Sequence, residues 1–382
     1  KKKINYFRYQ DHAIFNKNTK DEKPFLDIDH LGTYSPKYKF MLESIKKSKG
    51  LTYIYSRFVP AGALSIALTL EQNGYERYTV DGESQLLEYM PNKYGGGGKR
   101  KRICYLCGED ATNPIHKTTH KNYHKWKAAR YILLVGSYEH GEISKITPGK
   151  AAKIFSRRSN IYGEDVKILV GSSVSSEGLD FKCVRQVHII EPWYNLSKHE
   201  QIIGRAIRWC SHVDLPSEER NVGIYQYAAS SAQKSSNKLL LTETMDEKNY
   251  RLAEFKDIKI RNVMRILKKG AVDCALNIHG NMFLEKKHVQ HITSTGVKKD
   301  IIVGDEQYSR LCDYKKDCKY ECTWMPNPKE NYKINDDTYN VRFAKSDIEN
   351  AQKFIKILFR KDVIFELDNI VGYVHEKMPD IE

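Results

Sequence analysis

The chain has 382 residues, 40% hydrophobic and 29% charged, which is the composition of an ordinary globular protein long enough for two domains. Its formal net charge of +15 favours a polyanionic partner such as nucleic acid, although a lysine-rich surface is often only solvated. No apolar run is long enough to cross a membrane, and eight cysteines are too sparse for a disulfide scaffold. They suit a reducing compartment, with thiols free or metal-bound.

The opening KKKINYFRYQ lacks an initiator methionine and an apolar signal stretch, so we expect the chain to be a piece of a longer polypeptide. Residues 1–50 read as a linker with a helix over 36–47. Strands and helices then alternate up to residue 230. We expect strands over 51–58, 131–137, 166–173, 186–192 and 221–229, and helices over 62–75, 148–158 and 196–210.

This alternation predicts βα units, and therefore an α/β fold with a parallel sheet covered by helices on both faces. The strands are continuous apolar runs, as expected when both faces are buried. Residues 81–127 interrupt the pattern with GGGG beside KRKR, and we interpret them as a partly flexible insertion in a domain over 51–230. Residues 231–382 read as a C-terminal extension with a long helix over 242–277, a cysteine-containing irregular segment and a helix near 345–360.

Two polar segments follow neighbouring strands of the predicted sheet. GSSVSSEGLDF (171–181) places small hydroxyl residues, a glycine and an acid at the sheet edge where open parallel sheets bind ligands. QIIGRAIR (201–208) lies on the next predicted helix, with Ser197 as its expected N-cap. Arg205 and Arg208 are three residues apart, so on that helix they would share one face and reach the same anion. Such a pair suits a triphosphate, whereas the plainer alternative is two solvated arginines.

Three segments resemble motifs IV, V and VI of superfamily 2 helicases and translocases, in family order: SRFVPAG (56–62), SSVSSEGLDF (172–181) and QIIGRAIR (201–208). EPWYNLSKHEQIIGRAIRWCSH looks like one branch, the helicase-type ATPases of large nucleocytoplasmic DNA viruses. That branch includes the poxvirus early transcription factor ATPase subunit and nucleoside triphosphate phosphohydrolase. The resemblance covers residues 50–277 and implies a RecA-like fold for 51–230.

The resemblance also implies roles for individual residues. Arg205 and Arg208 would be arginine fingers that touch the γ-phosphate of ATP. Gln201 would lie near the phosphates, while Gly178 and Asp180 would contact the nucleotide, the latter near the ribose.

The resemblance also implies contacts to nucleic acid. Ser172 would bind a backbone phosphate, and Arg57 is a second candidate for contact with the same nucleic-acid strand. The alternative for Arg57 is a solvated arginine at the end of a β-strand.

The sequence contains no G-x-x-x-x-G-K-[ST] motif, since GGGGK (95–99) lacks both the spacing and the hydroxyl residue. Nor does an Asp-Glu pair end an apolar strand before residue 50. We therefore expect a separate N-terminal RecA-like lobe to bind most of ATP and Mg²⁺, and this chain alone to be inactive.

The stretch CYLCGEDATNPIHKTTH supplies Cys104, Cys107, His116 and His120 at a spacing that suits tetrahedral Zn²⁺, with His124 an equal candidate. A loop that has no hydrophobic core of its own, such as this one, also needs a cross-link such as a bound metal to hold its structure. The alternative is a histidine-rich basic loop with free cysteines.

A second cluster, Cys312, Cys318 and Cys322, lacks an obvious fourth ligand, so we expect no metal there and a core position for Cys274. KRKR (99–102) either contacts a phosphate backbone or is solvated.

Two functions remain in view. The first is the C-terminal half of a nucleic-acid-dependent ATPase, which by resemblance acts in viral transcription, with viral RNA polymerase or transcription factor subunits as partners. DNA is the expected nucleic acid, and the sequence leaves RNA open. By the same resemblance it would reside in the virion and in host cytoplasmic factories. The second is a non-catalytic, zinc-bearing module that binds nucleic acid or a transcription complex.

Overall fold

The computed structural model describes residues 7, 9, 24–79, 85–88, 102–136, 146–176, 178–230, 232–235, 238–241, 243–292, 297–325 and 341–379. The chain divides into two compact units, Lys1–Cys322 and Thr323–Glu382. Within the described residues, no helix is both long and apolar enough to cross a membrane.

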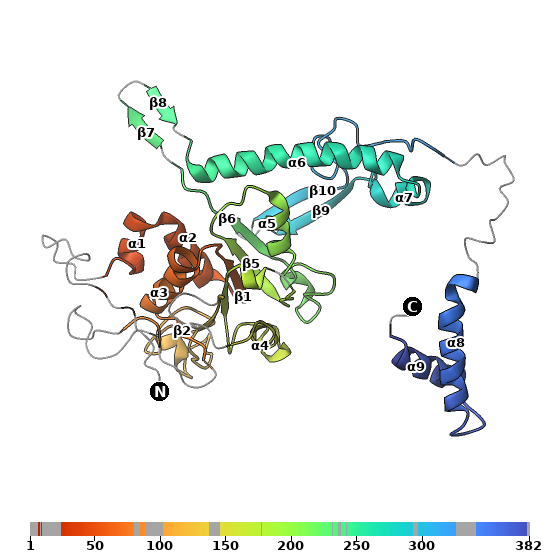
Figure 1. Ribbon diagram of the computed structural model, residues 1–382. Coiled ribbons are helices and arrows are strands. Elements are labelled where there is room, and N and C mark those ends of the chain that lie inside the picture. Colours follow the sequence, from red (N-terminus) through yellow and green to blue (C-terminus); the bar gives the residue numbers. More distant parts are fainter. Residues whose placement is uncertain are drawn as a thin grey trace, which may run out of the picture. The chain divides into compact units, whose positions relative to one another are not determined.

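Six parallel strands form the sheet of the larger unit, in the order β2-β3-β4-β1-β5-β6 (Figure 1). The strands are β1 (Leu51–Tyr55), β2 (Glu76–Arg77), β3 (Arg130–Leu134), β4 (Ile168–Gly171), β5 (Val184–Ile189) and β6 (Gly223–Gln226). At the centre, Tyr55 of β1 pairs with Gly171 on one side and Ile189 on the other. The carboxyl ends of β4, β1 and β5 therefore lie side by side.

Helices cover both faces of this sheet. One core cluster joins the sheet to α1 (Ile28–Tyr34), α2 (Pro36–Lys47) and α3 (Ser65–Gln72), and the other joins it to α4 (Pro148–Phe155) and α5 (Leu196–Ile203). Side chains alternate along β1, because Ile54 packs in the first cluster while Tyr53 and Tyr55 pack in the second. The expected α/β, RecA-like fold is confirmed.

The region after β6 differs in detail from the expected long helix. α6 (Met245–Gly270) begins with a capping box between Thr244 and Glu247, but the chain becomes extended at Ala271 before α7 (Cys274–Asn281). Two antiparallel ribbons, which the sequence did not suggest, pair β7 (Ala232–Ser235) with β8 (Lys238–Leu241) and β9 (Lys287–Ile292) with β10 (Lys298–Val303). The smaller unit holds α8 (Val341–Leu358) and α9 (Leu367–Lys377).

α6 is tied to the sheet domain near its amino-terminal end. Asp246 forms an ion pair with Lys37 of α2, and the Tyr250 hydroxyl donates to the carbonyl of Tyr227, 3.3 Å away, just beyond β6. These contacts join the start of the C-terminal region to the sheet domain, within the larger unit.

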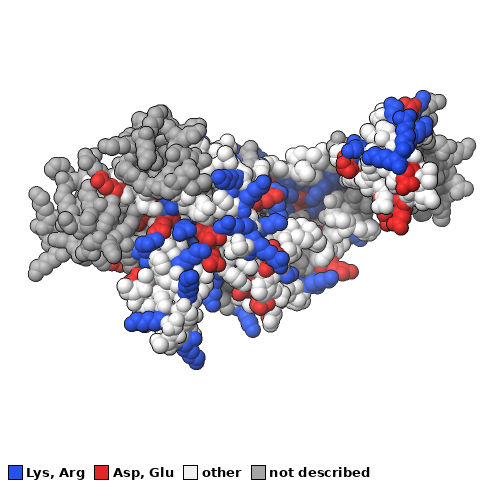
Figure 2. Space-filling model, turned by 90° about the horizontal axis from the view of Figure 1, so that it is seen from below, with Lys and Arg blue, Asp and Glu red and all other residues white. Residues whose placement is uncertain are grey.

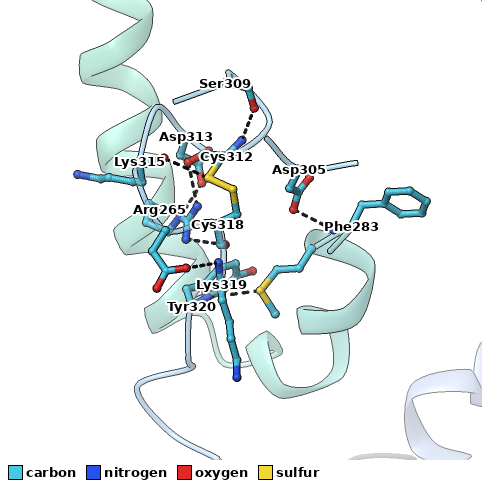
Figure 3. The surroundings of a disulfide bond; sticks show 12 residues. Arg265, Phe283, Asp305, Ser309, Cys312, Asp313, Lys315, Cys318, Lys319 and Tyr320 are labelled. Atoms are coloured by element: carbon cyan, nitrogen blue, oxygen red, sulfur yellow. Dashed lines mark hydrogen bonds and ion pairs between the residues drawn. A yellow bond between two sulfur atoms is a disulfide. The ribbon is translucent and has the colours of Figure 1, made fainter. Parts of the chain in front are cut away.

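Four cysteines of the C-terminal region form disulfides, Cys274–Cys322 and Cys312–Cys318, so the expectation of free or metal-bound thiols is wrong for these residues. Arg265 of α6 points into the loop that carries the second pair (Figure 3). Its Nε lies 2.8 Å from Asp313 Oδ2, and its guanidinium donates to the carbonyls of Cys312 and Cys318 at 3.1 Å each. The Arg265–Asp313 pair is buried, and the pairing fixes the loop to α6.

Candidate nucleotide and nucleic-acid site

The QIIGRAIR stretch is not one continuous helix. α5 ends at Ile203, and the segment from Gly204 to Arg208 lies in turns. The N-cap of α5 is Asn195, whose side-chain oxygen accepts a hydrogen bond from the backbone N–H of Ser197. The predicted helix over 196–210, its cap at Ser197 and the shared helix face of the two arginines are therefore wrong.

Arg205 and Arg208 nevertheless converge on the loop over 172–181. Arg205 donates from Nε to the carbonyl of Ser176 (3.0 Å) and from Nη1 to the carbonyl of Leu179 (3.2 Å). Arg208 places Nη1 2.7 Å from Asp180 Oδ1. Turns after α5, rather than helix periodicity, bring both guanidinium groups to the same loop.

The loop itself combines an exposed end with a buried one. Gly178 has φ +69°, a conformation that residues with a side chain rarely adopt, and the Asp180 side chain is 58% exposed. Ser172, in contrast, is buried, and its hydroxyl has no hydrogen-bond partner among the described residues. In this conformation the Ser172 hydroxyl does not face solvent.

A third cation, Lys198, was missed by the sequence reasoning. Its Nζ lies 2.9 Å from the Ser176 hydroxyl and 3.4 Å from Oε1 of the exposed Gln201. Its position on the first turn of α5, three residues before Gln201, was the available signal. The loop thus receives positively charged side chains both from the first turn of α5 and from the turns that follow this helix.

Glu191, which the sequence reasoning did not single out as a site residue, joins the motif IV loop to the end of β5. Its carboxylate accepts from the Ser56 hydroxyl at 2.8 Å and from the Arg57 backbone N–H at 3.0 Å. Burial raises the pKa of Glu191. Gly62 completes the contact, since a Cβ there would lie 1.8 Å from Ser56 Oγ.

Arg57 is exposed at the end of β1, yet it is not a freely solvated side chain. Its guanidinium carbon lies 4.0 Å from the ring centroid of Trp193 and 5.5 Å from that of Phe58. The ends of β1 and β5 therefore present a cation and aromatic rings together.

Residues 120–210 match the family described as helicase conserved C-terminal domain, and this range holds the motif V loop and the motif VI segment described above. Residues 120–210 therefore form a helicase C-terminal domain. The match begins in the 102–127 region and ends just after Arg208, so it covers the paired arginines and the loop that they contact.

Relatives of this helicase domain occur in large DNA viruses. A protein of Acanthamoeba polyphaga mimivirus, provisionally named ATP-dependent RNA helicase L377, is 27% identical over 92% of this chain and 30% of its own length. The termination factor NPH-I homolog of African swine fever virus (isolate Pig/Kenya/KEN-50/1950) is 30% identical over 64% of the chain and 33% of its own length. A protein provisionally named helicase 087L, from invertebrate iridescent virus 3, is 26% identical over 77% of the chain and 24% of its own length. The chain spans about a third of the length of the first two relatives.

The insertion in the helicase domain brings four potential metal ligands together. Their ligand atoms lie within 4.8 Å of one another, and the residues are Cys104, Cys107, His116 and His124. His120 is exposed and its Nδ1 accepts from a backbone N–H at 3.1 Å, so the structure replaces His120 with His124 in the predicted set.

The spacing of these ligand atoms fits a tetrahedral metal. Cys104 Sγ lies 3.4 Å from His124 Nε2, and Cys107 Sγ lies 3.6 Å from His116 Nε2. Zinc bonds of about 2.3 Å to sulfur and about 2.0 Å to nitrogen, at tetrahedral angles, separate the ligand atoms by about 3.5 Å. Two thiols and two imidazoles at this spacing can therefore hold Zn²⁺.

The buried Lys167 joins this ligand cluster to the sheet. Its Nζ donates to the carbonyl of Tyr105, between the two cysteines, at 2.6 Å and to the carbonyl of Ser48 at 2.7 Å. Of the KRKR run, Arg102 lies within the described residues, where it pairs with Glu76 and lies 5.2 Å from the ring centroid of Trp126. The other three basic residues lie outside the described residues.

Proposed function

We propose that this chain is the C-terminal half of a nucleic-acid-dependent ATPase of the superfamily 2 type, in which Arg205 and Arg208 act as arginine fingers. The observation that carries the proposal is that both guanidinium groups contact one loop at the carboxyl edge of the sheet, with Gly178 and Asp180 on it. This edge is where ligands bind in open parallel sheets.

The partners of the two arginines suggest different tasks. Arg205 donates to two loop carbonyls and so holds the loop in shape, while the remaining N–H groups of its guanidinium can still meet a phosphate. Arg208 and Asp180 are 47% and 58% exposed, and an ion pair of this kind contributes about 0–1 kcal/mol. Breaking this ion pair therefore costs little free energy, so a more highly charged γ-phosphate can draw Arg208 away. The Asp180 carboxylate is then able to accept a hydrogen bond from a ribose hydroxyl.

Gln201 and Lys198 line the same approach on α5 and would meet the polyphosphate next to the fingers. We further propose that ATP and Mg²⁺ are held mainly by a separate N-terminal RecA-like lobe, since the 382 residues contain no phosphate-binding G-x-x-x-x-G-K-[ST]. By this proposal the chain alone does not hydrolyse ATP, and closure of two lobes around the nucleotide drives movement along nucleic acid.

The test measures DNA-stimulated ATP hydrolysis by a protein that joins this chain to such a lobe. Arg208→Ala should lower the rate by about a thousandfold or more, because developing charge on the phosphate loses its counter-charge. Arg158→Ala is the matched control, since the Arg158 side chain is 87% exposed and pairs with Asp214, which is not a residue of the loop over 172–181. Activity of the Arg208→Ala protein equal to that of the control would overturn the arginine-finger assignment.

We propose DNA as the preferred nucleic acid, contacted at the strand ends by Arg57 and, after a shift of its loop, by Ser172. The net charge of +15 supports contact with nucleic-acid phosphates, and on the face drawn in Figure 2 lysine and arginine side chains gather over the larger unit. A titration of duplex binding against salt measures the phosphate contacts. A slope of log K on log salt near zero would contradict the proposed contacts.

A relative named as a termination factor homolog supports a role in viral transcription, with RNA polymerase or transcription factor subunits as partners in the virion and in cytoplasmic factories. The second candidate function is a non-catalytic module that binds nucleic acid or a transcription complex and is stabilised by Zn²⁺ on Cys104, Cys107, His116 and His124. The cluster of four potential ligands favours this candidate. Absence of ATP hydrolysis by the two-lobe protein, with nucleic-acid binding retained, would select this second function.

A further inference from the structure

We propose that the helicase domain carries a base-stacking site for single-stranded nucleic acid at the carboxyl ends of β1 and β5. The site, here called the aromatic–cation stack, consists of Arg57, Phe58, Trp193, Tyr194 and Lys256. It rests on the proposed nucleic-acid function and specifies the ligand further, as unpaired bases with their flanking phosphates.

The stack is a continuous series of cation, ring, ring and cation. The Arg57 guanidinium carbon lies 4.0 Å from the Trp193 ring centroid. The Trp193 and Tyr194 centroids are 5.1 Å apart with the rings inclined by 23°, and Lys256 Nζ of α6 lies 4.6 Å from the Tyr194 centroid. Three segments far apart in the sequence thus contribute to one surface.

The rings of this stack are accessible. Phe58 is 50% exposed and Tyr194 is 46% exposed, although aromatic rings of this size usually gain more from burial. Exposed aromatic rings between cations are the pattern by which proteins bind unpaired bases, because every base has a π-face and every nucleotide carries a phosphate.

Buried groups hold the two loops from behind. The Trp193 backbone N–H donates to His199 Nε2 at 2.9 Å, and burial lowers the pKa of His199, which keeps the imidazole neutral and able to accept. On the other loop, Glu191 accepts from the Arg57 backbone N–H at 3.0 Å. The two loops that carry the stack are therefore held by hydrogen bonds to groups outside it, in addition to the contacts among its own side chains.

The chemistry favours a single strand over a duplex. In a duplex both faces of each base are covered by its neighbours, whereas an unpaired base can lay one face on the exposed part of Tyr194 or Phe58. Lys256 is long and flexible, so a base can take its place over Tyr194 while its ammonium moves to the adjoining phosphate. Arg57 remains over Trp193 and meets the next phosphate.

The test measures fluorescence anisotropy of two labelled strands with the 382-residue chain: oligothymidylate, and an abasic strand of the same length that keeps the phosphates. Wild type should bind oligothymidylate more tightly than the abasic strand. Tyr194→Ala should weaken oligothymidylate binding by about fivefold to a hundredfold, the range that loss of one stacked base implies, and leave abasic binding within about twofold. Tyr194→Phe keeps a ring and should bind like wild type.

Tyr34→Ala is the matched control, because Tyr34 is a 61% exposed tyrosine of α1 outside the stack. Circular dichroism melting confirms that each variant is folded. If wild type binds neither these strands nor a duplex, the proposed nucleic-acid function fails. If it binds the duplex but neither single strand, the stack proposal alone is overturned. If wild type binds both strands equally, or if Tyr194→Ala binds oligothymidylate as tightly as Tyr34→Ala does, the stack proposal alone is overturned.

Discussion

Acidification should destabilise the helicase domain through His188, which lies in β5 and is fully buried. Its Nδ1 lies 2.7 Å from the Tyr227 hydroxyl and its Nε2 3.2 Å from Gln186 Oε1, while its ring stacks on Tyr225 with 4.6 Å between centroids. Burial lowers the pKa of His188 to about 3, because it removes the water that would solvate an imidazolium ion.

The sign and size of the effect follow from proton linkage. An unfolded histidine has a pKa of about 6.5, so as the pH falls the unfolded chain binds this proton long before the folded one does. The contribution of His188 to stability is complete above pH of about 6.5 and is lost progressively as the pH falls toward about 3. At a pH of about 5 the loss is RT ln(1 + 10^1.5), or about 2 kcal/mol.

Urea unfolding at a pH of about 7 and about 5 measures this loss. A chelator is present throughout, so that protonation of zinc-binding histidines does not contribute. His188→Phe is the comparison, because it keeps a ring that can stack on Tyr225 but cannot take up a proton. Wild type should lose about 2 kcal/mol more than the variant over this interval. Equal pH dependence in the two proteins would refute the assignment to His188.

Gly62→Ala should destabilise the domain by about 1–3 kcal/mol, since the added carbon would lie 1.8 Å from Ser56 Oγ, and an unchanged urea midpoint would contradict that close packing. Elemental analysis of the purified chain should find zinc, and His124→Ala should lower its content while His120→Ala leaves it unchanged; the opposite order would return His120 to the ligand set. Arg265→Ala should cost about 1–3 kcal/mol locally, because it removes the guanidinium that pairs with the buried Asp313 while Lys268 still pairs with that carboxylate. Limited proteolysis within 297–325 should then become faster, and a cleavage rate equal to wild type would argue against the role of Arg265.

The sheet domain could be predicted because its signals are local in sequence. Continuous apolar runs mark strands that both faces bury, and the runs at 51–58 and 166–173 became β1 and β4, flanked by helices at the expected places. Motif order then placed the loop over 172–181 after β4, at the carboxyl edge where open parallel sheets bind ligands, and the folded structure brings the segment over 201–208 to that loop.

Errors arose where the decisive contact is distant in sequence. Periodicity favoured a helix through Arg208, but the turn after Ile203 lets Arg205 bond to loop carbonyls that helix continuation would not reach. His120 and His124 were equal candidates by spacing, and the folded loop places His124 Nε2 3.4 Å from Cys104 Sγ. The choice between them depends on chain geometry and not on residue type.

The sequence alone determined the order of strands and helices, because the apolar side chains that must leave water mark each of them. It therefore determined a parallel α/β sheet with loops that carry glycine and arginine. Tertiary structure alone decided which atoms meet there. Glu191, His199 and Lys256 acquire their partners from other segments, and hydrogen bonds and ring contacts of a few ångströms depend on packing that no local pattern records.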